Sequence, residues 1–84
     1  MKDDRGLYYY PNPLKKNFRM YVKEVDGEIN FRMWNSEDPE LWTEHGWVPY
    51  SAIKQASEMY QGGNFDPKYA YDIELARALL KHDR

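Results

Sequence analysis

Apolar and polar residues alternate most regularly between residues 18 and 34, FRMYVKEVDGEINFRMW. Two runs rich in Phe, Tyr, Val, Ile and Trp flank Asp26-Gly27, a dipeptide that accepts the positive φ angles of a tight type I′ turn. The pattern predicts a β-hairpin closed by these two residues. Counting back from the turn gives the facing pairs, which are Val25 with Glu28, Lys23 with Asn30, Val22 with Phe31, Tyr21 with Arg32, Met20 with Met33, and Arg19 with Trp34.

This register divides the ribbon into two faces, and a slip of one residue would mix them. The apolar face carries Phe18, Met20, Val22, Ile29, Phe31 and Met33. The other face carries Arg19, Tyr21, Lys23, Val25, Asn30, Arg32 and Trp34. Because an isolated hairpin is marginal in water, something must cover the apolar face. We expect helices to cover it and the face with Arg and Trp to stay free.

A third strand is predicted at residues 6–10, GLYYY, before the sequence PNP, whose two prolines cannot continue a ladder. After Trp34 the pattern changes to helix signals. Asp38 is expected to cap a short helix that starts at Pro39 and ends at Gly46.

Two longer helices are expected after that. The first opens at Pro49 or Ser51, runs to about residue 61 and ends at Gly62-Gly63. The second starts at Asp66-Pro67 and continues to about His82.

The last helix has a wide apolar surface. A period of 3.6 residues places Tyr69, Ile73, Ala76 and Leu80 in one stripe, which Tyr71, Leu75, Ala78 and Leu79 extend. So wide a surface exceeds what one sheet face needs. Part of it should pack on the helix at residues 50–61 or meet another chain, which makes Tyr71, Leu75 and Leu79 a candidate binding face. Coverage by a helix of the same chain is an equally weighted alternative.

The order of elements predicts an α+β fold with helices on one face of the sheet. A small antiparallel sheet, the hairpin plus a third N-terminal strand, packs against two C-terminal helices and one short helix. Residues 1–84 are expected to form a single domain, because a second core in 84 residues could not bury enough apolar surface.

Composition supports a folded chain in a cytoplasmic setting. The sequence is 42% hydrophobic and 31% charged, with a net charge of −2, which argues against disorder. No stretch approaches 18 apolar residues and no apolar h-region follows the first charges, so we expect neither a membrane span nor a signal peptide. The absence of cysteine excludes disulfides and thiolate metal sites and is compatible with the cytoplasm.

No catalytic signature is present, so we expect no catalytic residue, no metal site and no cofactor. The most suggestive stretch, WTEHGW, pairs Glu44 with His45, but sequence neighbours rarely project to one point. Trp42 and Trp47 in the same stretch are better explained as packing around a bend. An enzyme would be favoured only if a cleft gathered His45 with carboxylates.

The non-apolar face of the hairpin is the main candidate binding site: Arg19, Tyr21, Lys23, Asn30, Arg32 and Trp34. Trp, Tyr and Arg are typical of interface hot spots, which predicts a non-enzymatic module that binds a protein partner or another copy of itself. Single-stranded nucleic acid is the alternative, because rings stack on bases while cations meet phosphates. Against it, the pI is about 5.6 and the glycine-aromatic signature of the common RNA-binding sheet is missing. Cross-strand pairs such as Tyr21 with Arg32 also stabilise sheets that bind nothing.

Overall fold

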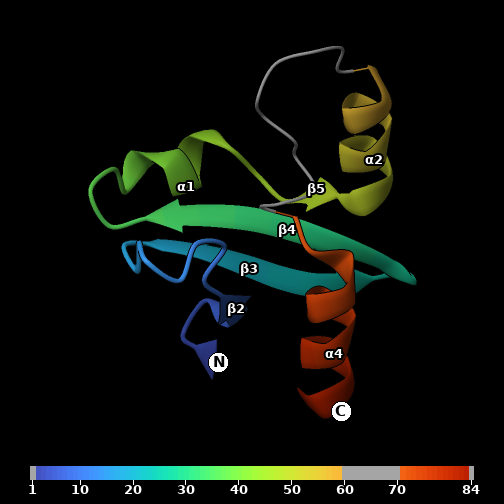
Figure 1. The fold of residues 1–84 in the computed structure, drawn as a ribbon, viewed down its shortest axis with the longest axis horizontal. Coiled ribbons are helices and arrows are strands. Elements are labelled where there is room, and N and C mark those ends of the chain that lie inside the picture. Colours follow the sequence, from blue (N-terminus) through green and yellow to red (C-terminus); the bar gives the residue numbers. More distant parts are fainter. Residues whose placement is uncertain (1, 60–70, 84) are drawn as a thin grey trace.

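The fold is seen in a computed structural model that describes residues 2–59 and 71–83. The elements in order are β1 (Lys2–Asp3), β2 (Gly6–Tyr9), β3 (Phe18–Val25), β4 (Glu28–Asn35), α1 (Glu40–Glu44), β5 (Val48–Pro49), α2 (Tyr50–Met59) and α4 (Ile73–Asp83). The strands form one antiparallel sheet in the order β1-β2-β3-β4-β5, so each strand pairs with its neighbour along the chain (Figure 1). The predicted α+β class is confirmed.

The β3–β4 hairpin has the predicted turn and the predicted register. Asp26 and Gly27 have φ angles of 52° and 81°, as a type I′ turn requires. All six expected pairs are present, from Val25 with Glu28 to Arg19 with Trp34. The local sequence therefore sets which side chains share a face.

Three further strands complete the sheet. The predicted N-terminal strand is confirmed as β2, which pairs with β3 through Leu7, Tyr8 and Tyr9. The two edge strands, β1 and β5, were not predicted, because two residues are too few to show an alternating pattern. Pro49 in β5 has no N–H to donate, which an edge strand tolerates.

The main core lies between the apolar face of the hairpin and the helices α2 and α4. The helix α4 contacts β2, β3 and β4, and α2 contacts β4 and β5. The buried residues are Tyr9, Met20, Val22, Ile29, Phe31, Ile53 and Ala76. The expectation that helices cover the Met and Phe face is confirmed.

The helix α1 begins and ends one residue away from the predicted caps. Pro39, not Asp38, occupies the N-cap position, and no side chain caps it. The carbonyl of Asp38 instead accepts a hydrogen bond from the N–H of Leu41 (3.1 Å), so a turn leads into the helix. At the other end the C-cap is His45 in an extended conformation, not Gly46.

The helix α2 starts at Tyr50, because Pro49 belongs to β5. Its first turn receives a cap from the hairpin, where Glu28 Oε1 accepts the N–H of Ser51 (3.0 Å). The hydrogen bond from the Ser51 side chain and, after it, this backbone hydrogen bond lower the pKa of Glu28 and outweigh the opposing effect of burial. The predicted helix end at Gly62-Gly63 lies outside the described residues.

The last helix starts later than predicted in the described part. Tyr71 and Asp72 are not helical, and α4 begins at Ile73, whereas the predicted start at Asp66-Pro67 lies outside the described residues. Asp72 acts as the cap, since its Oδ1 accepts the N–H of Leu75 (3.1 Å). The Tyr9 hydroxyl accepts the N–H of Asp72 (2.9 Å) and so ties β2 to the start of α4.

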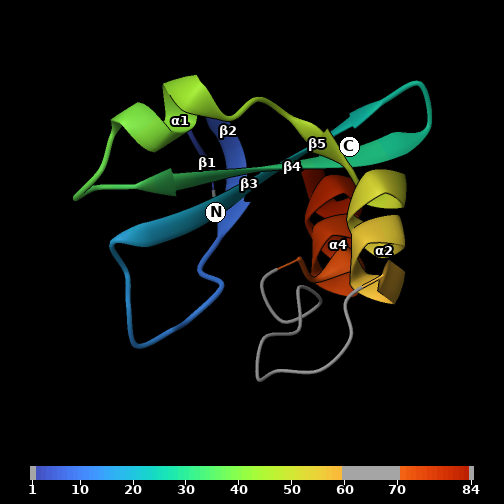
Figure 2. The ribbon, with the colours of Figure 1, turned by 90° about the horizontal axis from the view of Figure 1, so that it is seen from above.

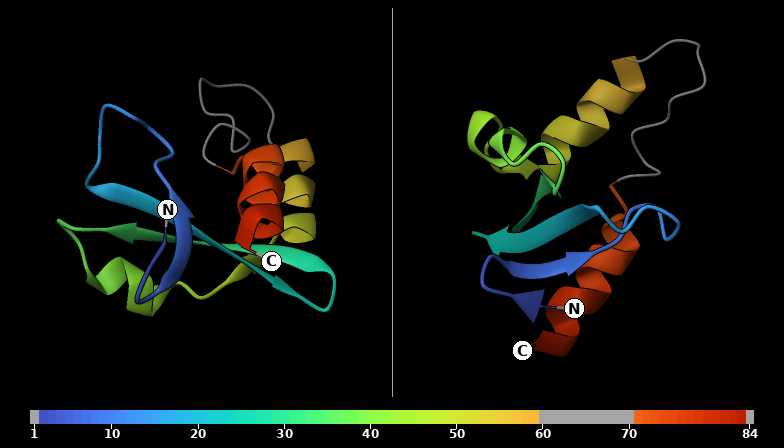
Figure 3. Two further views of the ribbon diagram at one scale, coloured as in Figure 1. Left: turned by 90° about the horizontal axis from the view of Figure 1, so that it is seen from below. Right: turned by 90° about the vertical axis from the view of Figure 1, so that its left-hand side faces the viewer.

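The helices do not share one face of the sheet, as the sequence had suggested. Figures 2 and 3 show α2 and α4 on one side of the β3–β4 ribbon and α1 on the other. The covering of the second face is therefore an arrangement that the pattern did not predict. None of the described helices is long and apolar enough to cross a membrane.

Candidate functional site

Tyr21 lies at the centre of the second sheet face and is completely buried, with 0% of its surface exposed. Its ring centroid is 5.3 Å from that of Tyr8 in β2 and 5.1 Å from that of Trp42 in α1. The expectation that this side chain is freely displayed is wrong. The reason is that β2 and α1 both bring aromatic rings onto it, and an aromatic side chain gains more by packing edge-to-face than by facing water.

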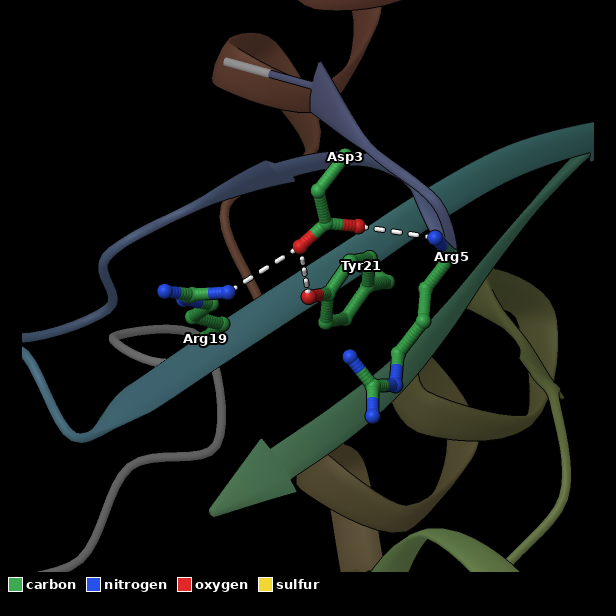
Figure 4. Close-up of polar contacts among 4 residues, drawn as sticks. All are labelled: Asp3, Arg5, Arg19 and Tyr21. Carbon is green, nitrogen blue, oxygen red and sulfur yellow. Dashed lines mark hydrogen bonds and ion pairs between the residues drawn. The ribbon is translucent and has the colours of Figure 1, made fainter. Parts of the chain in front are cut away.

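A carboxylate from the N-terminal strand closes over the Tyr21 hydroxyl. Asp3 Oδ2 accepts hydrogen bonds from Tyr21 OH (2.5 Å) and from Arg19 NH1 (3.0 Å). Asp3 Oδ1 accepts the backbone N–H of Arg5 (2.8 Å), which fixes the turn between β1 and β2. Figure 4 shows the carboxylate above Tyr21, with Arg19 and Arg5 on either side of it.

The pKa values of this pair move apart. Burial alone raises the pKa of Asp3, but the hydrogen bonds from Tyr21 and Arg5 and the charges of Arg19 and Arg5 outweigh it and lower the pKa. Burial raises the pKa of Tyr21, and its hydrogen bond to Asp3 raises it further. At neutral pH Asp3 therefore stays ionised and Tyr21 stays protonated. Their hydrogen bond is a fixed structural contact and offers no proton for chemistry.

Three arginines and three aromatic rings alternate across this face. The guanidinium of Arg5 lies over Trp34 (5.0 Å to the centroid) and over Trp42 (5.9 Å). Arg32 also lies over Trp42 (4.0 Å), and Arg19 lies over Trp34 (5.1 Å) and Tyr8 (4.9 Å). All of these distances are within the range of cation–π attraction. We call this set the cation–aromatic array: Tyr8, Arg19, Trp34, Arg5, Trp42 and Arg32.

Lys23 and Trp47 extend the array at one end. The Lys23 ammonium lies 4.4 Å from the centroid of Trp47, whose ring is 5.9 Å from that of Trp42. Arg5 and Lys23 are exposed, and the other members are half-buried. The array is therefore a surface feature whose rings are packed on the inner side and reach solvent on the outer side.

The anchoring of Arg32 explains how α1 is held over the sheet. Its Nε donates to the backbone carbonyls of Trp42 and His45 (3.0 Å each), and NH2 also donates to the Trp42 carbonyl. These acceptors lie at the C-terminal end of α1, where helix carbonyls lack partners within the helix. The positive charge of Arg32 also interacts favourably with the negative, C-terminal end of the helix dipole.

The structure places the six predicted hairpin residues in four kinds of position. Arg19, Arg32 and Trp34 join the array, and Tyr21 lies beneath it. Lys23 stands at its edge. Asn30 is half-buried and donates from Nδ2 to the carbonyl of Glu28 (3.0 Å), so it belongs to the sheet and not to the array.

Four contributors to the site were not among the predicted site residues: Asp3, Arg5, Tyr8 and Trp42. A signal for the first two was present, because Asp3 and Gly6 occupy the first and last positions that type I turns favour. Such a turn folds β1 back on β2 and so brings Asp3 and Arg5 to the hairpin. Tyr8 would follow from alternation in β2 once its pairing with β3 is known.

Most of the candidate face on the last helix packs against the core. Tyr71 and Leu79 pack against it, and the Tyr71 ring lies 5.5 Å from that of Phe31. Leu75 remains 38% exposed. A single exposed leucine is common on protein surfaces and does not make a patch.

Two clefts lie among the described residues. One of about 420 Å³ lies between the hairpin turn and α4 and mixes the charges of Glu24, Glu28, Arg77 and Lys81. The other, of about 270 Å³, includes His45, but its described lining contains no carboxylate. Among the described residues, no three metal-ligating side chains come together.

The array places three guanidinium groups against aromatic rings on one side of the sheet. No protein-family model matches the chain, and neither a curated protein nor a solved structure is significantly similar to it.

Proposed function

We propose that the protein is a small non-enzymatic interaction module that binds a protein partner, or a second copy of itself, through the cation–aromatic array. The observation that supports this most directly is the alternation of Arg5, Trp34 and Trp42 on a half-exposed surface. Arg, Trp and Tyr carry most of the binding energy at protein interfaces. Side chains that are stacked before binding lose less conformational entropy when a partner arrives.

Single-stranded nucleic acid is the weaker candidate for the same surface. The array has cations that could meet phosphates, but each of its rings already has a guanidinium over it. Base stacking on a free ring contributes about 1–3 kcal/mol per base in proteins that bind single strands. A base would have to compete with an arginine for these rings.

The test is to compare association of the wild type with that of Trp34→Ala. Size-exclusion chromatography with light scattering, over a range of concentrations, reports self-association, and chemical cross-linking followed by mass spectrometry reports partners. We expect Trp34→Ala to weaken whichever association occurs, with Leu75→Glu as the control on the opposite face. Equal association of wild type and Trp34→Ala would contradict the proposal.

The nucleic-acid alternative makes a separate demand. Binding of a mixed-sequence oligonucleotide should fall steeply as salt rises and should drop in Arg32→Ala. No binding at low salt would remove it. The cytoplasmic location expected from the lack of cysteine stays part of the proposal, and cell fractionation would test it.

A further inference from the structure

Arg5 differs from the other described arginines in how its guanidinium is used. Arg19, Arg32 and Arg77 each donate to a carboxylate or to a backbone carbonyl. Within residues 2–59 and 71–83, the Arg5 guanidinium donates no hydrogen bond and forms no ion pair. A guanidinium has five N–H donors, so an unusual number of charged donors is left at this point.

The Arg5 side chain nevertheless lies against other members of the array. The backbone N–H of Arg5 is bound to Asp3 (2.8 Å), and its guanidinium lies over the rings of Trp34 and Trp42. The guanidinium N–H groups donate to no described residue, so they are open to a ligand. The edge of a guanidinium carries the parallel N–H groups that a carboxylate binds with two hydrogen bonds.

We propose that the edge of the Arg5 guanidinium binds a carboxylate of an acidic partner segment. The exposed rims of Trp34 and Trp42 pack against the apolar part of the same segment. The proposal rests on the proposed function and adds the chemistry of the partner. Lys23, which lies over Trp47 at the end of the array and has no acceptor among the described residues, provides a second cation for the same segment.

A few carboxylates fit this surface better than a chain of phosphates. The turn before α1 and α1 itself expose the carboxylates Glu37, Asp38, Glu40 and Glu44. These charges disfavour a long polyanion on the side of the sheet where α1 lies, whereas a segment with one or two acidic side chains can avoid them. The guanidinium over each ring of the array also competes with base stacking.

The experiment measures fluorescence anisotropy of a labelled peptide that carries two Glu residues among Leu and Ala residues. The same peptide with Gln in place of Glu and an oligothymidylate of similar length are the comparisons. We expect the Glu peptide to bind and the Gln peptide to fail. Arg5→Gln should weaken binding by roughly tenfold or more, because it removes a charge-assisted contact. Arg5→Lys should lose less, since it keeps the charge but not the paired donors.

Arg77→Gln is the matched control, because Arg77 is exposed on α4 and outside the array. Circular dichroism and thermal melting establish that each variant is folded, which is expected for Arg5→Gln because the side chain is exposed and donates no hydrogen bond to a described residue. Failure of the Glu peptide to bind, or equal loss in Arg77→Gln, would overturn the inference. Equally tight, Arg5-dependent binding of oligothymidylate would overturn it in favour of phosphate.

The inference can fail without the proposed function. If association in the cross-linking assay depends on Trp34 but the Glu peptide does not bind, the array is an interface for a partner of other chemistry. If neither Trp34→Ala nor Arg5→Gln changes any association, both proposals fall.

Discussion

Asp3 holds the N-terminal strand against the hairpin and fixes one end of the cation–aromatic array. Its carboxylate receives three donors, from Tyr21, Arg19 and the backbone of Arg5. The aspartate and Arg19 side chains are 25% and 29% exposed, so water weakens this ion pair only in part. An exposed ion pair of the same geometry would stabilise the fold far less.

We expect Asp3→Asn to lower the free energy of unfolding by about 1–2 kcal/mol at neutral pH, since a charge-assisted acceptor is lost. Urea denaturation followed by tryptophan fluorescence measures it. Asp4→Asn is the control, because Asp4 is exposed and has no hydrogen bond to a described side chain. Equal stabilities of the two variants would show that the Asp3 contacts contribute nothing.

The same carboxylate makes stability depend on pH in a defined direction. The pKa of Asp3 is lower in the folded protein than its ordinary value of 3.8, so the stabilisation is complete above about pH 4 to 5. It is lost as the pH falls through the folded-state pKa. Urea denaturation of the wild type and Asp3→Asn at several pH values should show the difference between them shrinking below about pH 4. A constant difference would contradict this assignment.

At the residue scale, alternation in the sequence placed Tyr21 opposite Arg32 but could not tell whether Tyr21 is buried. Alternation decides which face a side chain takes, whereas burial depends on which distant segments cover that face. Here the covering rings come from Tyr8 and Trp42, one before and one after the hairpin. The local pattern therefore predicted which side chains share a face but not which of them are exposed.

At the scale of elements, the hairpin turn depends on glycine at one position. Gly27 has a φ of 81°, which L-residues with a Cβ rarely adopt. We expect Gly27→Ala to cost about 1 kcal/mol. Gly46→Ala is the matched control, because Gly46 lacks such a φ and an added Cβ would meet nothing within 4 Å. Thermal melting of both variants measures the difference in stability. A Gly27→Ala variant as stable as the wild type would argue against the type I′ turn.

The helix α4 makes a second prediction at this scale, based on two alanines. Ala76 is completely buried against the sheet, while Ala78 is exposed. We expect Ala76→Leu to destabilise the fold by about 1–3 kcal/mol through overpacking, and Ala78→Leu to change it little. Urea denaturation measures both. Tolerance of leucine at position 76 would mean that α4 is placed differently on the sheet.

Elements with strong local signals were predicted, and short ones were not. The hairpin and β2 have alternating residues and defined turns, so their existence and pairing could be inferred. The edge strands β1 and β5 have two residues each and form because longer strands offer them unpaired edges. In the described part α4 begins at Ile73, where Asp72 provides a cap that the periodicity of the sequence did not reveal.

At the scale of the whole molecule, the sheet is covered on both sides in different ways. Aliphatic and aromatic side chains fill the side under α2 and α4, whereas rings, cations and one carboxylate fill the side on which α1 lies. A sequence with one obvious apolar face predicts only the first layer. The second layer depends on long-range contacts such as Arg32 with the end of α1, for which no short-range pattern exists.

The central claim is that the array is assembled in the free protein. Proton NMR tests it through the side chain of Arg5, which lies over the rings of Trp34 and Trp42. We expect ring currents to shift its δ-methylene protons upfield, with nuclear Overhauser contacts to both indoles that weaken in Asp3→Asn. Ordinary shifts for an unstructured arginine, with no contact to either indole, would contradict the account.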